Sequence, residues 1–281
     1  MNGIEVYLDK VIEGDCLAIL PGIPDRSIHL ILCDLPYGTT VIAWDKVIDL
    51  ERLWKEYERI ILPNGSIILT SQGLFTGKLI SSNPKWFKYK IVWVKSSATN
   101  FLNGKKQPLR RHEDICVFYN GKPTYNPQLQ RGKITITKAG KIKRKSDSQG
   151  HIKPLPFVTK SRDRYPYDVV FFEEEQMVDS LYFKNASSEG PIFHPTQKPI
   201  GLSRYLVRTF SNKGDIVLDN ACGSGSFLVA AVMEHRHFIG IEKNEKSVHQ
   251  GETADYIKIT NSRIAGAIKW RRDEDAKLSL F

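Results

Sequence analysis

The sequence predicts an α/β fold, in which a mostly parallel sheet is covered by helices on both faces. Short apolar runs typical of buried strands alternate with stretches of helical spacing before residue 120 and again after residue 199. Two of the predicted strands end on an aspartate, Asp34 and Asp219, and a turn containing Pro or Gly follows each aspartate. The 281 residues suffice for one such domain and an insertion.

The elements before residue 120 are predicted from their apolar pattern. His29–Cys33 is a short apolar run that predicts a buried strand, and the turn DLPYG follows it at once. Leu50–Leu62 has the apolar spacing of a helix, which Pro63 and Gly65 end. Further strands are predicted at residues 66–70, Lys90–Lys95 and Asp114–Tyr119.

The pattern changes between residues 120 and 190, where periodicity is weak and Gly, Pro, Ser, Gln, Lys and Arg dominate. Lys138–Lys145 is a dense basic run, and Arg162–Tyr167 interleaves cations with aromatic residues. We therefore expect an inserted lobe with long loops here. The α/β pattern then returns, with helices predicted at Ile200–Phe210, Phe227–Glu234 and Glu245–Arg263, strands at Asp215–Asp219 and His237–Glu242, and an exposed charged tail after Ala267.

Charge and cysteine usage narrow the class of protein. Lys and Arg number 41 against 31 Asp and Glu, and the formal net charge of +10 favours a polyanionic partner, nucleic acid first; a basic protein without such a partner is the alternative. The four cysteines lie far apart, so neither a disulfide framework nor a zinc site is predicted. No apolar run approaches the roughly 20 residues of a membrane span. The first ten residues lack the apolar segment of a signal peptide, so we expect a cytoplasmic protein.

The segment after the strand at Asp215–Asp219 predicts a nucleotide-binding turn. Gly223 and Gly225 allow the backbone to approach a ligand, and the start of the following helix favours an anionic group. Glu242 ends the next strand and can accept both hydroxyls of a ribose. Leu228 stands where a dinucleotide fold usually has a third glycine, which favours a nucleoside ligand. A plain tight turn is the alternative.

Asp34, Pro36 and Tyr37 form a second constellation, in the turn after the first predicted strand. Pro36 restricts the backbone, so Asp34 and Tyr37 are held on one side of a stiff turn. A carboxylate and a backbone carbonyl can accept the hydrogens of an amino group, and an aromatic ring can stack on a base swung out of its helix. A surface turn with a buried Tyr is the alternative.

His194–Pro199 is the third segment, and it directly precedes the helix predicted at Ile200–Phe210. Thr196 and Lys198 offer hydrogen-bond donors near the start of that helix, which suits the carboxylate of a ligand resembling an amino acid. A simple capped helix start would give the same pattern.

Together the three segments resemble the amino-group DNA methyltransferases of bacterial and phage restriction-modification systems, in particular the permuted subclass called beta. In that subclass the catalytic D-P-P-Y segment comes first, a target-recognition region follows, and the cofactor glycine motif lies near the C-terminus. Asp34–Tyr37, the complete H-P-T-Q-K-P segment at His194–Pro199 and the D-x-x-x-G-S-G pattern at Asp219–Gly225 stand in this order. The resemblance covers most of residues 9–120 and 190–263.

The resemblance implies a circularly permuted, Rossmann-like S-adenosylmethionine-dependent methyltransferase fold with an inserted target-recognition region. Its parts are expected to be a catalytic half at residues 1–120, a target-recognition and DNA-binding insertion at 121–190, a cofactor-binding half at 191–267 and a charged tail at 268–281. The implied partners are S-adenosylmethionine and duplex DNA, with no metal and no membrane. Dimers are frequent among beta members, so a homodimer stays open.

The resemblance also assigns roles to residues of this chain. Asp34 and the carbonyl of Pro36 would hold the target amino group, Tyr37 would stack on the flipped base, and attack on the methyl group would be direct, without a covalent enzyme intermediate. The residues implied in cofactor binding are Asp34, Asp15 near the adenine, Thr196 and Lys198 at the carboxylate, Asp219, Cys222, Gly223 and Gly225 in the methionine-end turn, and Glu242 at the ribose.

Three positions depart from the family pattern, and none removes a group that the chemistry requires. Leu35 stands for a more usual Pro, Asn220–Ala221 for Pro-Phe, and Ser226–Phe227 for Thr-Thr. The aspartate at position 34 favours adenine N6 as the target, because members acting on cytosine N4 more often have Ser there. Cytosine N4 remains the alternative. Further alternatives are methylation of RNA or a protein glutamine, a non-catalytic DNA-binding protein that kept the fold, and a nucleotide-dependent oxidoreductase.

Overall fold

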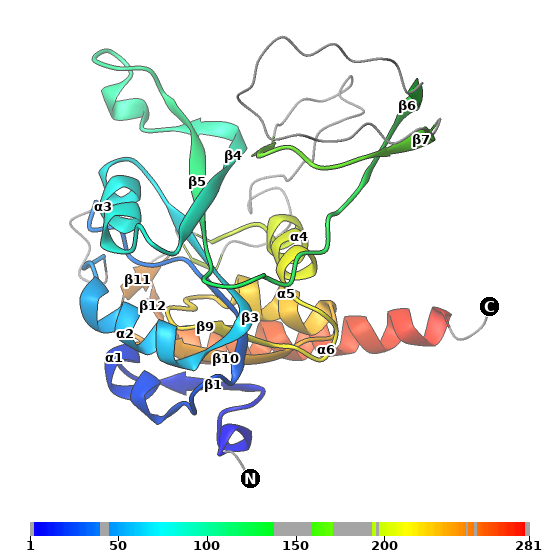
Figure 1. The fold of residues 1–281 in the computed structure, drawn as a ribbon. Coiled ribbons are helices and arrows are strands. Elements are labelled where there is room, and N and C mark those ends of the chain that lie inside the picture. The colour runs from blue at the N-terminus through cyan, green and yellow to red at the C-terminus, as the bar shows by residue number, and fades with distance from the viewer. Residues whose placement is uncertain are drawn as a thin grey trace.

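The protein, seen here in a computed structural model, is built around an eight-stranded mixed sheet with helices on both faces (Figure 1). The structure describes residues 3–39, 45–137, 159–170, 193–194, 197–245, 247–249 and 252–278. In sheet order the strands are β1 (Lys10–Glu13), β10 (His237–Glu242), β9 (Ile216–Asp219), β2 (Ile28–Cys33), β3 (Ile61–Ser71), β5 (Arg110–Phe118), β4 (Phe87–Thr99) and β8 (Val169–Val170). The first five are mutually parallel, and β5 is antiparallel to β3 and β4. The expected Rossmann-like α/β fold is confirmed.

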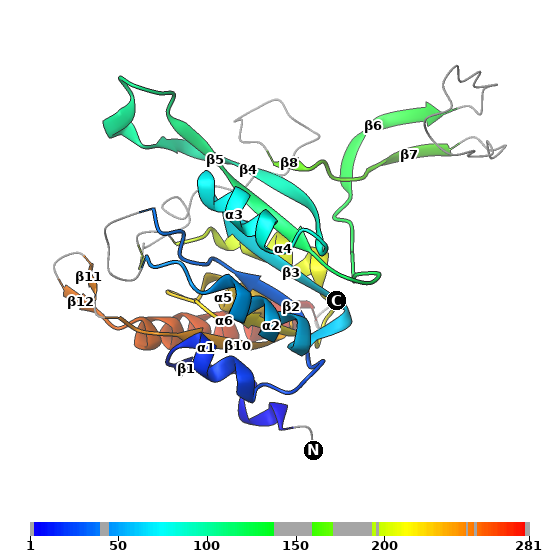
Figure 2. The same ribbon diagram turned by 60° about the vertical axis from the view of Figure 1, so that its left-hand side comes forward.

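The helices divide between the two faces of the sheet (Figure 2). On one face lie α1 (Cys16–Ile19), α2 (Leu50–Ile60) and α3 (Leu74–Ser82), and on the other lie α4 (Ile200–Phe210), α5 (Ser226–Met233) and α6 (Tyr256–Leu278). The core strands are therefore covered on both sides, which is why they consist of nearly unbroken apolar residues.

The apolar residues of β2 pack alternately into two hydrophobic clusters, one on each face of the sheet. Leu30 and Leu32 pack in the cluster that includes α4, α5 and α6, whereas Ile31 and Cys33 pack in the cluster that includes α2 and α3. Successive side chains of a strand point to opposite faces, so a strand between two helical layers needs apolar residues at every position. Asp34 follows at the point where this burial ends.

The chain order brings the two motif-bearing turns together. β2 leads through α2 to β3 on one side, and β9 leads through α5 to β10 on the other. β2 and β9 are themselves parallel neighbours, with Ile31 paired to Leu218. The connections thus diverge between these strands, and ligands of open α/β sheets bind at the carboxyl ends of strands at such a switch point. Asp34 and Asp219 both lie there.

Several predicted elements differ in their bounds. β3, β4 and β5 begin three to five residues before the predicted strands, and β4 also ends four residues later. The helix expected at Glu245–Arg263 begins only at Tyr256, after a small ribbon of β11 (Ser247–His249) and β12 (Glu252–Ala254). The β-branched residues Val248 and Thr253 are partners in the register of this ribbon, and such residues favour strands over helices. At its other end α6 continues to Leu278, so most of the expected tail is helical.

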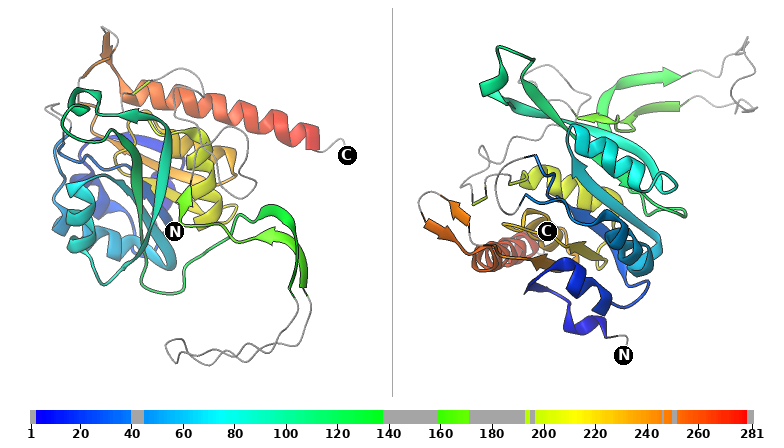
Figure 3. Two further views of the ribbon diagram at one scale, coloured as in Figure 1. Left: turned by 90° about the horizontal axis from the view of Figure 1, so that it is seen from above. Right: turned by 90° about the vertical axis from the view of Figure 1, so that its left-hand side faces the viewer.

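The predicted insertion is described only in part. β6 (Gln130–Thr137) and β7 (Thr159–Arg164) form a separate antiparallel ribbon that projects from the main sheet in both views of Figure 3. The basic run Lys138–Lys145 and the site residue Thr196 lie outside the described residues. Among the helices that are described, none has the length and apolar character needed to cross a membrane. The described part of the chain also contains no group of three or more His, Cys, Asp or Glu that could hold a metal ion.

Candidate active site

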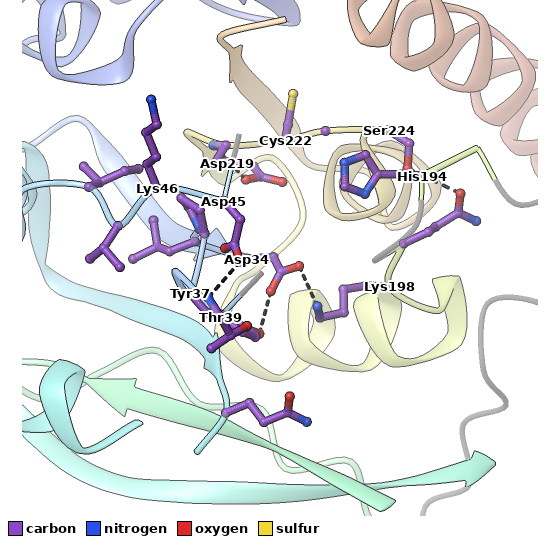
Figure 4. Close-up of a pocket in the computed structure, with 18 of the residues that line it drawn as sticks. Asp34, Tyr37, Thr39, Asp45, Lys46, His194, Lys198, Asp219, Cys222 and Ser224 are labelled. Atoms are coloured by element: carbon purple, nitrogen blue, oxygen red, sulfur yellow. Dashed lines mark hydrogen bonds and ion pairs between the residues drawn. The ribbon is translucent and has the colours of Figure 1, made fainter. Parts of the chain in front are cut away.

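A cavity of about 980 Å³ lies at the carboxyl ends of β9 and β2, where both motif-bearing turns open into it (Figure 4). Apart from Gly225 and the undescribed Thr196, every predicted site residue lines this cavity. These are Asp15, Asp34, Pro36 and Tyr37 from the first half of the chain and Lys198, Asp219, Cys222, Gly223 and Glu242 from the second. The structure therefore brings together residues that lie far apart in the sequence.

Asp34 is the centre of a hydrogen-bond network at the floor of this cavity. The hydroxyl of Tyr37 donates to its Oδ1 at 2.8 Å, and the hydroxyl of Thr70 donates to the same oxygen. The ammonium of Lys198 lies 2.5 Å from Oδ2. Burial by itself raises the pKa of Asp34, but the Lys198 charge and these hydrogen bonds outweigh it, so the pKa lies below its ordinary value. Asp34 is thus held as a carboxylate.

Lys198 joins Asp34 to a second acid. Its side chain is 5% exposed, and its Nζ also lies 3.4 Å from Glu113 Oε2 on β5. Glu113 in turn forms an ion pair with Lys95 on β4. Burial lowers the pKa of Lys198, but the two carboxylates more than offset this and raise it. The structure therefore places this ammonium between the carboxylates of Asp34 and Glu113.

The turn after Asp34 is braced from two sides. Asp45 accepts the backbone N–H groups of Gly38 and Thr39, each at 2.8 Å. Gly38 has φ +68°, a conformation that suits glycine. The Tyr37 ring stacks on Phe75 of α3, with centroids 5.2 Å apart. Burial and the nearby acids raise the pKa of Tyr37 well above its ordinary value, so its hydroxyl stays a donor.

The glycine turn on the other side of the cavity is held by Glu242. The Glu242 carboxylate accepts the N–H of Gly223 at 2.7 Å and that of Asn244 at 3.0 Å. Each of its oxygens keeps acceptor capacity for a further donor. Gly223 and Gly225 have φ of +49° and +76°, so both predicted glycines occupy positions that other residues rarely adopt.

Three further predicted residues differ in character. Burial raises the pKa of Asp219 to about 8, so much of this carboxyl is protonated at neutral pH. Burial likewise raises the pKa of the Cys222 thiol well above its ordinary value, which fits a turn residue and not a nucleophile. Asp15 caps α1 by accepting the N–H of Leu17 at 2.8 Å, while lining the cavity.

Sequence reasoning assigned no role to Thr70, Glu113 or Asp45. Thr70 of β3 follows Leu69, which is paired with Cys33, so Thr70 lies beside Asp34, the first residue after β2. The predicted strands at 29–33 and 66–70 carried this signal, because neighbouring parallel strands end at one edge. Glu113 lies in a His-Glu pair that resembles an H-E element of the family, but its contact with Lys198 could not be read from that pair. Asp45 offered no signal, since its partners are reached only through the folded loop.

The fold and this cavity define an α/β protein with a ligand-sized cavity at the switch point of its sheet. A family model for N6/N4 DNA methylases matches residues 28–253, and the chain belongs to that family. DNA adenine methyltransferase YhdJ of Escherichia coli (strain K12) is 27% identical over 280 residues, which cover 95% of this chain and 86% of the relative. Type II methyltransferase M.BglII of Bacillus subtilis is 26% identical over 261 residues, covering 86% and 67%.

Solved structures share the fold at low sequence identity. The M1.HpyAVI–SAM complex superposes with a TM-score of 0.55 at 18% identity, covering 90% of this chain and 98% of that one. TTHA0409 of Thermus thermophilus, complexed with S-adenosyl-L-methionine, gives 0.55 at 18%, covering 92% and 94%. The cytosine-N4-specific PvuII DNA methyltransferase gives 0.55 at 15%, covering 91% and 92%. These likenesses concern the fold.

Proposed function

We propose that this DNA methylase transfers a methyl group from S-adenosylmethionine to N6 of adenine in duplex DNA. The observation that carries the proposal is the ionised Asp34 carboxylate, which shares one cavity with Tyr37 and the Pro36 backbone on one side and with Glu242 and the glycine turn on the other. A cavity of this size accommodates a nucleoside-type ligand together with a flipped base.

The residues of the glycine turn fit the proposed cofactor. Glu242 has acceptor capacity for ribose hydroxyls, and the turn at Gly223 leads into the N-terminus of α5, which favours a carboxylate. Eight acidic residues and five Lys or Arg line the cavity, so acids outnumber cations there even with Asp219 protonated, which suits a positively charged ligand. When bound, S-adenosylmethionine supplies a methyl group made electrophilic by its positive sulfur. Asp15, Asp219 and Cys222 would complete its walls.

The Asp34 turn would prepare the amino nitrogen for attack. The lone pair of an exocyclic amino group is delocalised into the base, which makes it a poor nucleophile. Asp34 and the Pro36 carbonyl would accept its two hydrogens and turn the lone pair toward the methyl group. Bond formation makes the amino hydrogens strongly acidic, so the carboxylate of Asp34 can take the departing proton despite its low pKa.

Adenine is favoured over cytosine by two observations. The first residue of the motif is an aspartate, Asp34, and the Escherichia coli relative that spans almost the whole chain is described as a DNA adenine methyltransferase. The cytosine-N4-specific structural neighbour shares only the fold. Cytosine N4 is accordingly the second outcome that the experiment must separate.

The test is methyl transfer to DNA of mixed sequence. Purified protein is incubated with labelled S-adenosylmethionine and plasmid DNA, the DNA is hydrolysed, and the modified nucleoside is identified. We expect N6-methyladenine, and a loss of at least about 100-fold in rate for Asp34→Ala at saturating cofactor. Asp273→Ala removes an exposed aspartate of α6 and serves as the matched control.

Other results would contradict parts of the proposal. N4-methylcytosine would support the same mechanism with cytosine as the target base. Full activity of Asp34→Ala would show that the Asp34 turn takes no part in catalysis. Cofactor binding without label in any DNA contradicts the proposed substrate, and RNA and protein are then tested in the same assay.

A further inference from the structure

The β4–β5 hairpin carries an ordered tip that stands away from the body of the sheet (Figures 1 and 2). Thr99 and Arg110 form the last paired position of the two strands. Between them the short 3-10 helix η3 (Phe101–Asn103) is closed by backbone bonds from Gly104 to Phe101 and from Lys106 to Asn103. Residues 99–110, here called the hairpin tip, therefore form a compact turn with a defined shape.

The tip presents large apolar side chains to solvent. Phe101 is 69% exposed, Leu102 is 99% exposed and Leu109 is 39% exposed. Phe101 and Leu102 belong to η3, between the two strands, and neither is part of the two core clusters. Single exposed apolar residues are ordinary, but two adjacent ones in a structured hairpin form a candidate contact surface for another molecule.

The charge around these side chains indicates the chemistry of that molecule. Residues 96–112 contain Lys105, Lys106, Arg110 and Arg111 and no Asp or Glu. An exposed apolar pair flanked only by cations suits a polyanion with an apolar interior. Duplex DNA is such a polyanion, because its phosphates enclose stacked bases. A second copy of this chain, with a net charge of +10, is a poorer electrostatic partner.

The position of the tip relates it to the catalytic cavity. Thr99, Asn100, Asn103, Gln107 and Arg110 line the same cavity as Asp34. The Arg110 guanidinium donates to the side chain of Gln72, which directly follows β3, and so ties the tip to the strand that supports Asp34. The tip therefore forms part of the wall of the cavity that holds Asp34.

We propose that Phe101 and Leu102 insert into the DNA stack at the position that the target base leaves, while Lys105 and Lys106 contact the adjacent phosphates. The inference rests on the proposed function, because it assigns an element of the chain to the extrusion of the base. Flipping a base costs its stacking and pairing energy, and an apolar wedge that occupies the gap offsets part of that cost. The wedge stabilises the extruded state without touching the reacting atoms.

The experiment compares substrates that differ only in the cost of extrusion. The methylated position is first mapped in plasmid DNA treated with the unaltered protein. A short duplex containing that site is then prepared fully paired, and a second with an abasic site opposite the target base. Phe101→Ala/Leu102→Ala is compared with Leu278→Ala, which truncates a 74% exposed leucine at the far end of α6.

For the paired duplex we expect the double variant to lose roughly 10- to 100-fold in kcat/KM. For the duplex with the abasic site we expect it to come within about two-fold of the unaltered protein, because extrusion then costs little. Leu278→Ala should match the unaltered protein on both. This selective rescue is not expected of a general folding or binding defect.

Four results would overturn the proposal. Equal losses on both duplexes would make the tip a plain binding contact, and no loss on either would remove it from DNA binding. If the unaltered protein sediments as a dimer and the double variant as a monomer, Phe101 and Leu102 contact a second copy of this chain instead of DNA. If the unaltered protein labels no DNA, the proposed function itself is contradicted, and the proposal for the hairpin tip fails with it. This outcome is distinguishable from the others because it is seen without any variant.

Discussion

The ammonium of Lys198 lies 2.5 Å from Asp34 Oδ2, although 164 residues separate the two in the chain. The contact joins the first turn of the site to the segment that precedes α4. Glu113 also approaches Lys198 and is itself paired with Lys95, so the four side chains alternate in charge. The adjacent Lys198 charge lowers the pKa of Asp34 and keeps it ionised, which the proposed chemistry requires.

Lys198→Met should impair methyl transfer in a pH-dependent way. Lys198 lowers the pKa of Asp34, so its removal raises that pKa and shifts the acidic limb of the kcat–pH profile to higher pH. We expect kcat to fall by at least about 10-fold at neutral pH. The profile is measured by single-turnover methyl transfer at saturating cofactor.

Lys198→Arg is the matched control, since it keeps the positive charge and should keep the acidic limb close to its original position. Circular dichroism establishes that both variants fold, because a buried pair that loses one partner can cost about 3 kcal/mol. If the acidic limb is unchanged in Lys198→Met and cofactor binding is weaker instead, the role of Lys198 is to bind the cofactor carboxylate.

Asp45→Ala should loosen the turn that carries Tyr37. The variant removes the acceptor of two backbone N–H groups, those of Gly38 and Thr39. Misplacement of the turn is expected to lower kcat/KM by about 10-fold. Asp215→Ala is the comparison, because Asp215 also accepts a backbone N–H but at the amino end of β9, away from the cavity. Equal losses in both variants would show that only general stability is affected.

The free energy of unfolding should decrease from mildly acidic pH to about pH 8, in part through Asp219. Burial raises the pKa of Asp219 to about 8. Between its unfolded pKa near 4 and about 8, the folded state therefore binds more protons than the unfolded state, and stability falls as pH rises. Urea unfolding at about pH 5 and about pH 8 measures the decrease.

Asp219→Asn cannot ionise, so its stability should decrease less over the same interval. Glu242, whose pKa is also raised by burial, is present in both proteins and contributes equally to each. Identical pH dependence in the two proteins would show that Asp219 is ionised at an ordinary pKa.

Gly225→Ala should destabilise the protein, because Gly225 has φ +76° and an added Cβ would overlap the Thr260 side chain of α6. We expect a loss of about 2 kcal/mol in the free energy of unfolding. Thr260→Ser removes the clashing methyl group but keeps the hydroxyl that donates to the Gly223 carbonyl. In a double-mutant cycle this serine should recover part of the loss, and strict additivity would contradict the predicted clash.

Much of the architecture could be predicted because it rests on local patterns. The bounds of β10 and α4 were predicted to the residue, and those of β2 and β9 to within one residue. These elements are buried on faces set by apolar spacing. The start of α6 was misplaced because Glu245–Ala254 is short and polar, and its end because the last turns are exposed, where no apolar period signals a helix. β1 and α1 were not predicted, since each has only four residues.

The sequence by itself determined the order of the elements, the two motif-bearing turns and the family resemblance, because each of these depends on residues close together in the chain. Only the tertiary structure decided what those residues touch. Lys198 meets Asp34 and Glu113, and Thr70 meets Asp34, because β9, β2, β3 and β5 assemble in one order. The charge on Asp34 and the place of the hairpin tip at the cavity follow from that packing, and no local pattern encodes a contact across 164 residues.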